Sequence, residues 1–250
     1  MVNKYFNPNT AVVPVYNKPE FSSGKITEII LGESCEIIGT EKNWFQVVQD
    51  DGYKGWVNSF FGYVSDKFIS TSHLYIGQTI SFDWDGQKQF IPFGARIDQN
   101  NPIFNDHSWG NSIVPLKQNH VIENVIPLAK TLLGVPYRWG GKTSFGFDCS
   151  GLIQTVCRAC GIQLPRDAWQ QQEALSEYQI EASDALPGDI HFFGEKDKVT
   201  HVGFSLNGKK ILHAQGWVKE ESFNDNESNY NQSLVDKYLS SYSIRRNFRP

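Results

Sequence analysis

Residues 145–161 read FGFDCSGLIQTVCRACG, and this stretch decides how the second half of the chain folds. After Asp148, apolar residues recur at positions 152, 153, 156, 157 and 160, which is the spacing of one face of an α-helix. The pattern predicts a helix from about Cys149 to Ala159, with Gly161 at its end. Because Asp is a common N-cap residue, Asp148 marks the start of this helix and places Cys149 in its first turn.

The two later cysteines of this stretch, Cys157 and Cys160, form a C-x-x-C pair. A structural zinc site takes four ligands, usually from two such pairs, and Cys35 lies far away in the sequence without a paired cysteine. A redox-active pair normally stands at the N-terminal end of a helix, whereas this pair stands at the C-terminal end. We therefore interpret Cys157 and Cys160 as small buried side chains, and we expect no metal and no cofactor.

Cys149 has a different position, because it stands where the loop enters the helix. Unpaired backbone N–H groups and the helix dipole favour an anion there, so we expect the pKa of its thiol to lie below the ordinary value. Gly146 and Gly151 leave room for a substrate to approach. A lowered pKa and access are what a cysteine nucleophile needs, provided that a base lies within reach.

His201 and His213 are the candidates for that base and for the group that orients it. They lie in two predicted strands, VTHVGFSL and KKILHAQG, on either side of the turn signal Asn207–Gly208. With a two-residue turn at those positions the histidines would point to opposite faces, because one step of register reverses every side chain. A site that uses both therefore requires an odd offset. We predict a three-residue loop over 207–209, with Gly208 or a neighbour left-handed and a bulge beside it.

Three regions follow one another along the chain. Residues 1–72 contain short alternating strands, including a hairpin with the turn signal Asp51–Gly52, and predict a small all-β SH3-like barrel. Residues 73–118 repeat this character more weakly, and we interpret them as a second, degenerate SH3-like module. Residues 119–250 carry a helical pattern at 125–133, then the helix that begins with Cys149, then strands. Helices followed by strands predict an α+β domain with an antiparallel sheet.

The composition argues against several classes of function. The net charge is −4, so the chain has no basic excess with which to hold a nucleic acid. No apolar run approaches the roughly 20 residues that span a bilayer. The first residues, MVNKYFNPNT, lack the apolar segment of a secretory signal, so we expect a cytoplasmic protein, or a periplasmic or extracellular one if a leader was removed. Four cysteines are too few for a disulfide scaffold, and the oligomeric state stays open.

Five blocks, PYRWGG, FDCSGL, LPRDAWQQ, PGDIHFF and HVGFSL, occur in this order over residues 136–206. Together they resemble the NlpC/p60 cysteine peptidases of bacterial cell-wall turnover, whose members often carry SH3-like domains in front. The resemblance implies a papain-like catalytic domain, in which a helix that bears the cysteine packs on an antiparallel sheet. It implies that Cys149 is the nucleophile, His201 the general base and His213 the polar group that orients His201.

The resemblance is greatest to short members that act on small peptidoglycan peptides, the γ-D-glutamyl-L-diamino-acid endopeptidases. It implies that Asp148 and Ser150 help to bind the free amine of an N-terminal L-Ala. Arg166 matches a basic residue near the substrate, and its guanidinium suits the α-carboxylate of D-Glu. Tyr137 matches an aromatic residue on the wall of the cleft.

In such members an acidic residue and a tyrosine of the first SH3-like domain close the amine end of the cleft, and Glu28 and Tyr63 are our candidates for them. The implied activity is hydrolysis of the bond between γ-D-Glu and a diamino acid in trimmed peptidoglycan peptides, as in murein peptide recycling. An N-acetylmuramoyl-L-alanine-type amidase, an acyltransferase and a catalytically inactive SH3-like cell-wall-binding protein are the alternatives. The identity of the diamino acid stays open.

Overall fold

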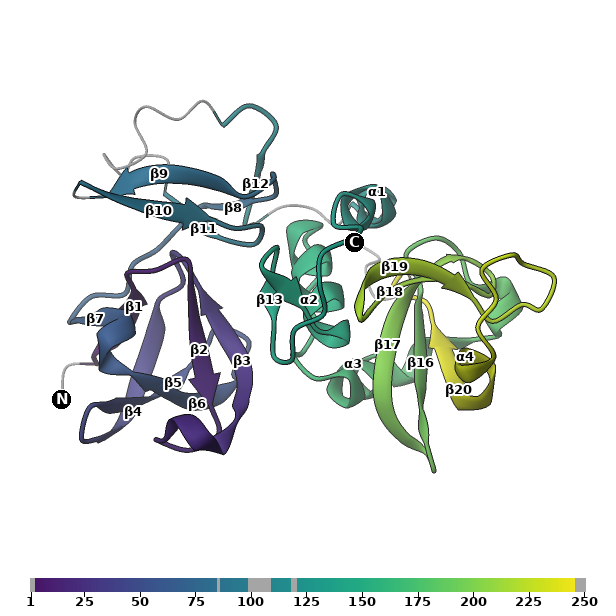
Figure 1. The fold of residues 1–250 in the computed structure, drawn as a ribbon, viewed down its shortest axis with the longest axis horizontal. Coiled ribbons are helices and arrows are strands. Elements are labelled where there is room, and N and C mark those ends of the chain that lie inside the picture. Colours follow the sequence, from purple (N-terminus) through teal and green to yellow (C-terminus); the bar gives the residue numbers. More distant parts are fainter. Residues whose placement is uncertain (1–2, 85, 99–108, 118–120, 246–250) are drawn as a thin grey trace. The chain divides into compact units, whose positions relative to one another are not determined.

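The computed structural model describes residues 3–84, 86–98, 109–117 and 121–245. The chain separates into two compact units (Figure 1). The first unit holds residues 1–118 together with 139–145, and the second holds 119–138 and 146–250. Segment 139–145 begins inside the PYRWGG block of the family resemblance, so its place in the first unit was not predicted from the sequence.

The first unit begins with a seven-stranded antiparallel sheet in the order β3-β2-β6-β5-β4-β1-β7. Alternation of buried and half-buried residues along β2 supplies Val13 and Val15 to the barrel core, where they meet Phe6, Val47 and Val57. The expected hairpin is β5–β6, and Gly52 in its turn has a φ of 82°. The strands are β1 Tyr5–Pro8, β2 Val12–Tyr16, β3 Lys25–Ile30, β4 Cys35–Glu41, β5 Trp44–Val48, β6 Lys54–Asn58 and β7 Gly62–Ser65.

The middle segment forms two small sheets, a β9–β10 hairpin and a three-stranded sheet in the order β11-β8-β12. Phe82, Ile91 and Ile97 pack with Ile30 and Leu31 of the barrel segment, so the two parts share one apolar cluster. The second SH3-like module stays a prediction, since residues 99–108 and 118 lie outside the described residues. The strands are β8 His73–Tyr75, β9 Ile80–Trp84, β10 Gln87–Ile91, β11 Arg96–Ile97, β12 Ile113–Pro115 and, from the returning segment, β13 Lys142–Thr143.

The second unit is an α+β domain, as the order of patterns predicted. Its antiparallel sheet has the order β15-β20-β16-β17-β18-β19. The helices are α1 Val125–Lys130, α2 Cys149–Ala159, α3 Ala168–Ala174 and α4 Gln232–Lys237. The strands are β14 Gly146–Phe147, β15 Gln179–Ile180, β16 Ile190–Glu195, β17 Lys198–Asn207, β18 Lys210–Gln215, β19 Trp217–Ser222 and β20 Tyr238–Tyr242. Both units also contain short 3₁₀ helices, which are η1 Phe21–Ser23 and η2 Ser59–Phe61 in the first unit and η4 Ile122–Asn124, η5 Ser176–Tyr178 and η6 Ala182–Asp184 in the second.

Helix α2 occupies the centre of the second unit and has the bounds that the sequence predicted. Every residue of α2 is buried, and the helix packs on β17, β18 and α1. The carboxylate of Asp148 caps the helix by accepting a hydrogen bond from the N–H of Gly151 at 2.6 Å. Cys157 and Cys160 lie in the core, as interpreted from their spacing. In the described residues no helix is both long enough and apolar enough to cross a membrane.

Candidate active site

Cys149 lies in the first turn of α2, against the strand that carries His201. Backbone N–H groups of Ser150 and of Val202, the residue after His201, hydrogen-bond to the sulfur. Cys149 is 8% exposed, whereas Cys157 at the far end of the helix is fully buried. The packing of α2 on β17 thus brings the predicted nucleophile next to the strand of the predicted base.

The predicted lowering of the Cys149 pKa is wrong for the free site. Burial, together with the charge of Asp148, raises the pKa of the thiol to about 12. The N–H groups at the helix start and the guanidinium of Arg166 act in the opposite direction, but they do not outweigh burial. The helix terminus favours the thiolate, but desolvation disfavours the charged form of a buried thiol more strongly. Cys149 therefore rests as a neutral thiol.

His201 and His213 point to the same face of the sheet and contact each other directly. Nε2 of His201 lies 2.7 Å from Nδ1 of His213. Nε2 of His213 in turn lies 3.0 Å from Oε2 of Glu221, on the next strand, β19. The three side chains form one continuous chain of hydrogen bonds that runs across β17, β18 and β19.

The protonation states of this chain follow from its burial. Burial first, and then the proximity of His213, Lys219 and Lys237, lowers the pKa of His201 to about 3, against the opposing effect of Glu221. The pKa of His213 is also lowered, again chiefly by burial. Hydrogen bonds from His213, Lys219 and Asn231 lower the pKa of Glu221 to about 2, although burial opposes them. The free site therefore holds two neutral imidazoles beside one carboxylate.

The shared face of the two histidines depends on how β17 accommodates one extra residue. The odd offset was predicted correctly, but the predicted three-residue loop is wrong. Asn207 pairs with Lys210 across a two-residue turn in which Gly208 has a φ of 53°, and the register shifts between Ser205 and Asn207. The bulge therefore falls at Leu206, inside the strand. Local turn signals located the hairpin, but they did not determine which side of it would absorb the extra residue.

A buried ion pair lies beside Cys149. The guanidinium of Arg166 donates to both carboxylate oxygens of Asp148, at 3.1 and 2.6 Å, and to the hydroxyl of Ser150 at 3.0 Å. Arg166 is 2% exposed and Asp148 is 6% exposed. The structure thus brings together the three residues that the resemblance implied for substrate binding. It also shows that Arg166 and Asp148 are each other's partners.

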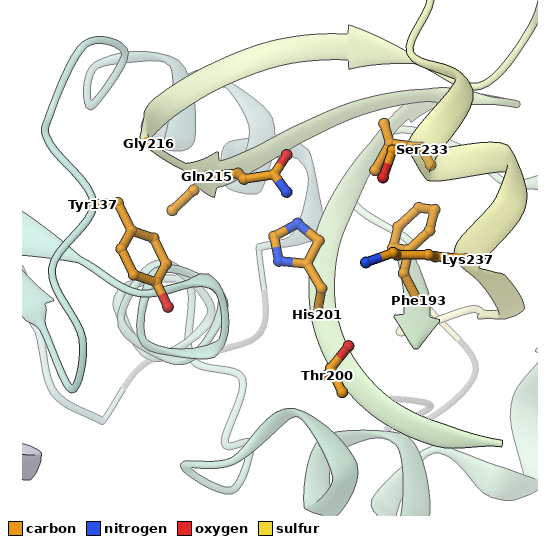
Figure 2. Close-up of a pocket in the computed structure, with 10 residues that line it drawn as sticks. Tyr137, Phe193, Thr200, His201, Gln215, Gly216, Ser233 and Lys237 are labelled. Atoms are coloured by element: carbon orange, nitrogen blue, oxygen red, sulfur yellow. The ribbon is translucent and has the colours of Figure 1, made fainter. Parts of the chain in front are cut away.

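Tyr137 links the cysteine to a pocket that His201 enters. Burial, with smaller effects of the nearby Cys149 and Asp148, raises the pKa of the Tyr137 hydroxyl to about 12. The backbone N–H of Tyr137 donates to the carbonyl of Gly216 at 2.8 Å. This hydrogen bond holds the segment between α1 and α2 against the β18–β19 turn. Tyr137 and His201 line a pocket of about 230 Å³. Figure 2 shows the imidazole of His201 projecting into the middle of this pocket, with Tyr137 on one side and Lys237 on the other.

Comparison with known proteins identifies two domains in the chain. Residues 134–240 match the NlpC/P60 family, and residues 11–70 match the bacterial SH3 domain. The chain carries an NlpC/P60 domain preceded by a bacterial SH3 domain. The resemblance drawn from the five sequence blocks is confirmed, and so is the fold class that it implied.

Three similar proteins illustrate the extent of the likeness. The γ-D-glutamyl-L-lysine dipeptidyl-peptidase of Bacillus subtilis is 29% identical over 214 residues, which are 75% of this chain and 71% of that protein. The γ-DL-glutamyl hydrolase of the same organism is 40% identical over 243 residues, with 81% of this chain and 58% of that protein covered. The crystal structure of an NlpC/P60 family protein from Bacillus cereus has a TM-score of 0.80 at 16% identity, covering 98% of this chain and all of that one. The family match and the first two likenesses support a peptidase, and the third supports the fold alone.

Glu28 and Tyr63, the candidates for the amine end, lie in the first unit rather than in the NlpC/P60 domain. Glu28 is on β3 and is 2% exposed, and its carboxylate accepts hydrogen bonds from Nζ of Lys25 at 2.7 Å and from the N–H of Lys142 at 2.9 Å. Tyr63 is on β7, at the other edge of the strand order, and its side chain is exposed. Their role at the amine end stays a prediction.

Glu221 is the residue of the NlpC/P60 domain that the sequence reading missed. Its signal was present, because Gly216 is a turn residue between two alternating segments. A hairpin centred on Gly216 pairs Gln215 with Trp217 and His213 with Lys219, so odd-numbered residues of β18 and β19 share a face.

Among the described residues, no group of three or more His, Cys, Asp or Glu side chains is arranged to hold a metal ion.

Proposed function

We propose that the protein is a cysteine peptidase that hydrolyses the bond between γ-D-Glu and a diamino acid in peptidoglycan-derived peptides with a free N-terminal L-Ala. The observation that carries the proposal is the contact between His201 and His213, on a strand that packs against the helix start bearing Cys149. Two similar proteins are named for γ-glutamyl bonds, which supports this choice of bond. Turnover of trimmed peptides, as in murein recycling, is the role we propose for it.

The chemistry begins from a neutral thiol and a neutral imidazole. Nε2 of His201 is engaged by His213, so Nδ1 is the nitrogen left to take the proton of Cys149. The sulfur attacks the γ-carbonyl carbon of D-Glu as that proton leaves, and backbone N–H groups at the start of α2 stabilise the oxyanion. The imidazolium of His201 then donates its proton to the amine of the diamino acid as the C–N bond breaks.

The thioester that remains is hydrolysed by water. His201, neutral again, takes a proton from the water as its oxygen attacks the thioester carbonyl, and the departing sulfur recovers a proton from His201. Neither half of the cycle requires a redox partner or a cofactor. Because the free site holds a neutral thiol, a base must take its proton as the sulfur attacks, and we expect His201 to be essential for that reason.

Selection of a free amine is the second part of the proposal. The carboxylate of Asp148 would pair with the substrate ammonium while Arg166 holds it in place. Ser150 would add a hydroxyl, Tyr137 would form the wall, and Glu28 and Tyr63 would close the amine end from the SH3 domain. Because Asp148 already forms an ion pair with Arg166, the ammonium of the substrate would bind to a carboxylate that also keeps its hydrogen bonds from Arg166.

A comparison of L-Ala-γ-D-Glu-L-Lys, its meso-diaminopimelate counterpart and their N-acetylated forms tests the proposal. We expect hydrolysis of free-amine peptides alone. Equal cleavage of the acetylated forms would overturn amine selection, cleavage of a muramoyl-L-Ala bond would identify an amidase, and cleavage of none would favour a binding protein. Transfer of the acyl group to an added amine in place of water would identify an acyltransferase.

Replacement of the cysteine provides the control within the same helix. Cys149→Ala is expected to abolish hydrolysis and to leave the thermal unfolding curve nearly unchanged. Cys157→Ala removes a fully buried sulfur, so it should retain kcat and lose about 1 kcal/mol of unfolding free energy. Activity in Cys149→Ala would rule out a thiol nucleophile at this position.

A further inference from the structure

We propose that Glu221 is a positioning residue that acts through His213 to hold His201 in the one tautomer able to take the thiol proton. The inference rests on the proposed cysteine chemistry and deepens it, because it adds a fourth member to the chain of Cys149, His201 and His213. In the mechanism that we propose, Glu221 contacts neither the substrate nor the sulfur of Cys149. Its effect passes through the imidazole of His213.

The direction of each hydrogen bond follows from what the end group can do. An ionised carboxylate only accepts hydrogen bonds, so Nε2 of His213 must donate to Oε2 of Glu221. A neutral imidazole carries one N–H, and therefore Nδ1 of His213 is an acceptor. Nε2 of His201, 2.7 Å away, must then be the donor. Nδ1 of His201 is left without a proton and is ready to act as a base.

His213 alone would not impose this order. An imidazole in the third position can present either an acceptor or a donor at Nδ1, unlike a carboxylate, which is always an acceptor. If His213 carried its proton on Nδ1, Nε2 of His201 would have to accept. The proton of His201 would then sit on Nδ1, and the base would be blocked. Glu221 removes this second arrangement because its oxygen offers His213 no hydrogen to accept.

The structure holds Glu221 firmly in this position. Nζ of Lys219 donates to its Oε1 at 2.7 Å, and Nδ2 of Asn231 donates to its Oε2 at 2.9 Å. Lys219 also lies over the ring of Trp217, 5.0 Å from its centre. Each oxygen thus faces a donor, and Glu221 and Lys219 are both less than one-fifth exposed. A carboxylate with donors on both oxygens stays ionised and stays aligned with His213.

Room for the contact comes from the strand opposite. A Cβ added to Gly203, on β17, would lie 2.9 Å from Cβ of His213 and 2.4 Å from Cδ1 of Ile211. Glycine at this position lets the imidazole of His213 lie between His201 and Glu221. The hydrogen bonds that join His201, His213 and Glu221 therefore depend on the backbone at Gly203 as well as on the three side chains.

The most direct test needs no substrate. Imidazole ¹⁵N chemical shifts distinguish protonated from unprotonated nitrogens, so spectra of the whole protein should show both His201 and His213 protonated at Nε2. In Glu221→Gln, the amide NH₂ can donate to His213, and we expect the protons of both rings to move to Nδ1. A wild-type spectrum with His213 protonated at Nδ1 would overturn the proposal, whether or not the variant folds.

Alkylation of Cys149 by iodoacetamide at pH 7 measures the base without assuming a peptide substrate. We expect Glu221→Gln to slow this reaction at least tenfold, since it removes a base whose contribution to proton transfer is about 10²–10⁴-fold. With the peptide, the same variant should lose kcat by a similar factor and keep its KM. The matched control is Glu220→Gln, because Glu220 precedes it on β19 and pairs with Lys130 at 3.0 Å.

A double-variant comparison separates tautomer control from a merely structural role. Asn at position 213 would place its Oδ1 where Nδ1 of His213 lies and could accept from His201 without help, as in Cys-His-Asn sites. We therefore expect Glu221→Gln to cost nothing further in a His213→Asn background. An equal cost in both backgrounds would show that Glu221 only supports the fold, and would overturn the proposal. If no peptide is cleaved but the spectra and alkylation behave as expected, the proposed substrate fails and the positioning role stands.

Discussion

At the scale of single residues, the groups around Cys149 act on its thiol in opposite directions. Burial and Asp148 raise its pKa, while two backbone N–H groups and Arg166 lower it. His201 faces a similar balance, in which burial dominates over the charge of Glu221. Both groups are consequently neutral in the free site, and in the mechanism that we propose charge develops only as the proton passes from sulfur to imidazole. A helix N-terminus by itself does not make a thiolate when the site is dry.

Ultraviolet absorption of the thiolate measures this resting state directly. Because the pKa of Cys149 is raised to about 12, the difference spectrum between the wild type and Cys149→Ser should show no thiolate at pH 7. The signal should appear only as the pH rises above about 10, where a detectable fraction of the thiol ionises. A thiolate band at pH 7 that disappears in acid would instead show a preformed thiolate–imidazolium pair.

The pair of Arg166 and Asp148 makes a prediction about stability. Arg166→Met leaves the buried carboxylate of Asp148 without its bidentate partner, so the free energy of unfolding should fall by about 3–5 kcal/mol. Adding Asp148→Asn removes that charge while keeping an oxygen to cap Gly151, so the double variant should be more stable than Arg166→Met alone. Denaturant titration of the wild type and the two variants measures this. Equal stability of the single and double variants would show that charge burial is not the cause.

At the scale of elements, the site depends on the strand register of the β17–β18 hairpin. The bulge at Leu206 moves β17 by one residue relative to β18, and this step puts His201 on the same face as His213. If the same residues paired without a bulge, every side chain of β17 beyond the turn would point the other way. The turn at Gly208 can form with or without the bulge. The extra residue therefore belongs to the strand, and its place in the bulge keeps the two histidines on one face.

Deletion of Leu206 removes the bulge but leaves Ser205 opposite Ile211 and Phe204 opposite Leu212, so His201 and His213 should stay on one face and hydrolysis should be retained. Leu206→Ala is the matched control, since it keeps the backbone bulge and changes only a half-buried side chain. We expect that control to keep most of kcat. Circular dichroism and thermal unfolding would show whether the deletion variant is still folded. A folded deletion variant without activity would contradict this, and would show that the register of β17 and β18 does not by itself keep the two histidines together.

At the scale of the whole molecule, buried histidines gather in the second unit and connect its stability to pH. His191 is fully buried, with Nδ1 2.7 Å from Oγ of Ser241 and Nε2 2.9 Å from the carbonyl oxygen of Gly208. Burial lowers its pKa from 6.5 to about 4. The folded protein thus keeps His191 neutral between these pH values, while the unfolded chain binds a proton.

The sign of the pH dependence follows from this difference. The stability that neutral His191 contributes is fully present above pH 6.5 and is lost as the pH falls towards about 4, a loss of about 3 kcal/mol over the window. His201 and His213 add to it in the same direction. Calorimetry from pH 7 to 4 should show a falling unfolding temperature. His191→Gln should reduce the slope, and an unchanged slope would assign the effect to other groups.

Much of the fold was readable from local patterns. The apolar stripe and Asp148 predicted α2 with its observed ends, and alternation with a turn signal predicted β17 and β18. The sequence reading missed β20, whose residues YLSSY show no clear alternation, because its place between β15 and β16 is set by pairing with distant strands. The apolar pattern at 125–133 predicted a longer helix than α1, which ends at Lys130. Turns then lead the chain to Gly134, which has a φ of 86°.

The sequence by itself determined the chemistry available to this protein, since Cys149, His201 and His213 could be named from a helix start and two strands. Only the tertiary structure decided that Glu221 completes their chain of hydrogen bonds, that Leu206 supplies the offset, and that Cys149 rests as a neutral thiol. The reason is physical. Helix caps and strand alternation depend on neighbours in the chain, whereas strand register and desolvation depend on contacts between residues far apart in the sequence.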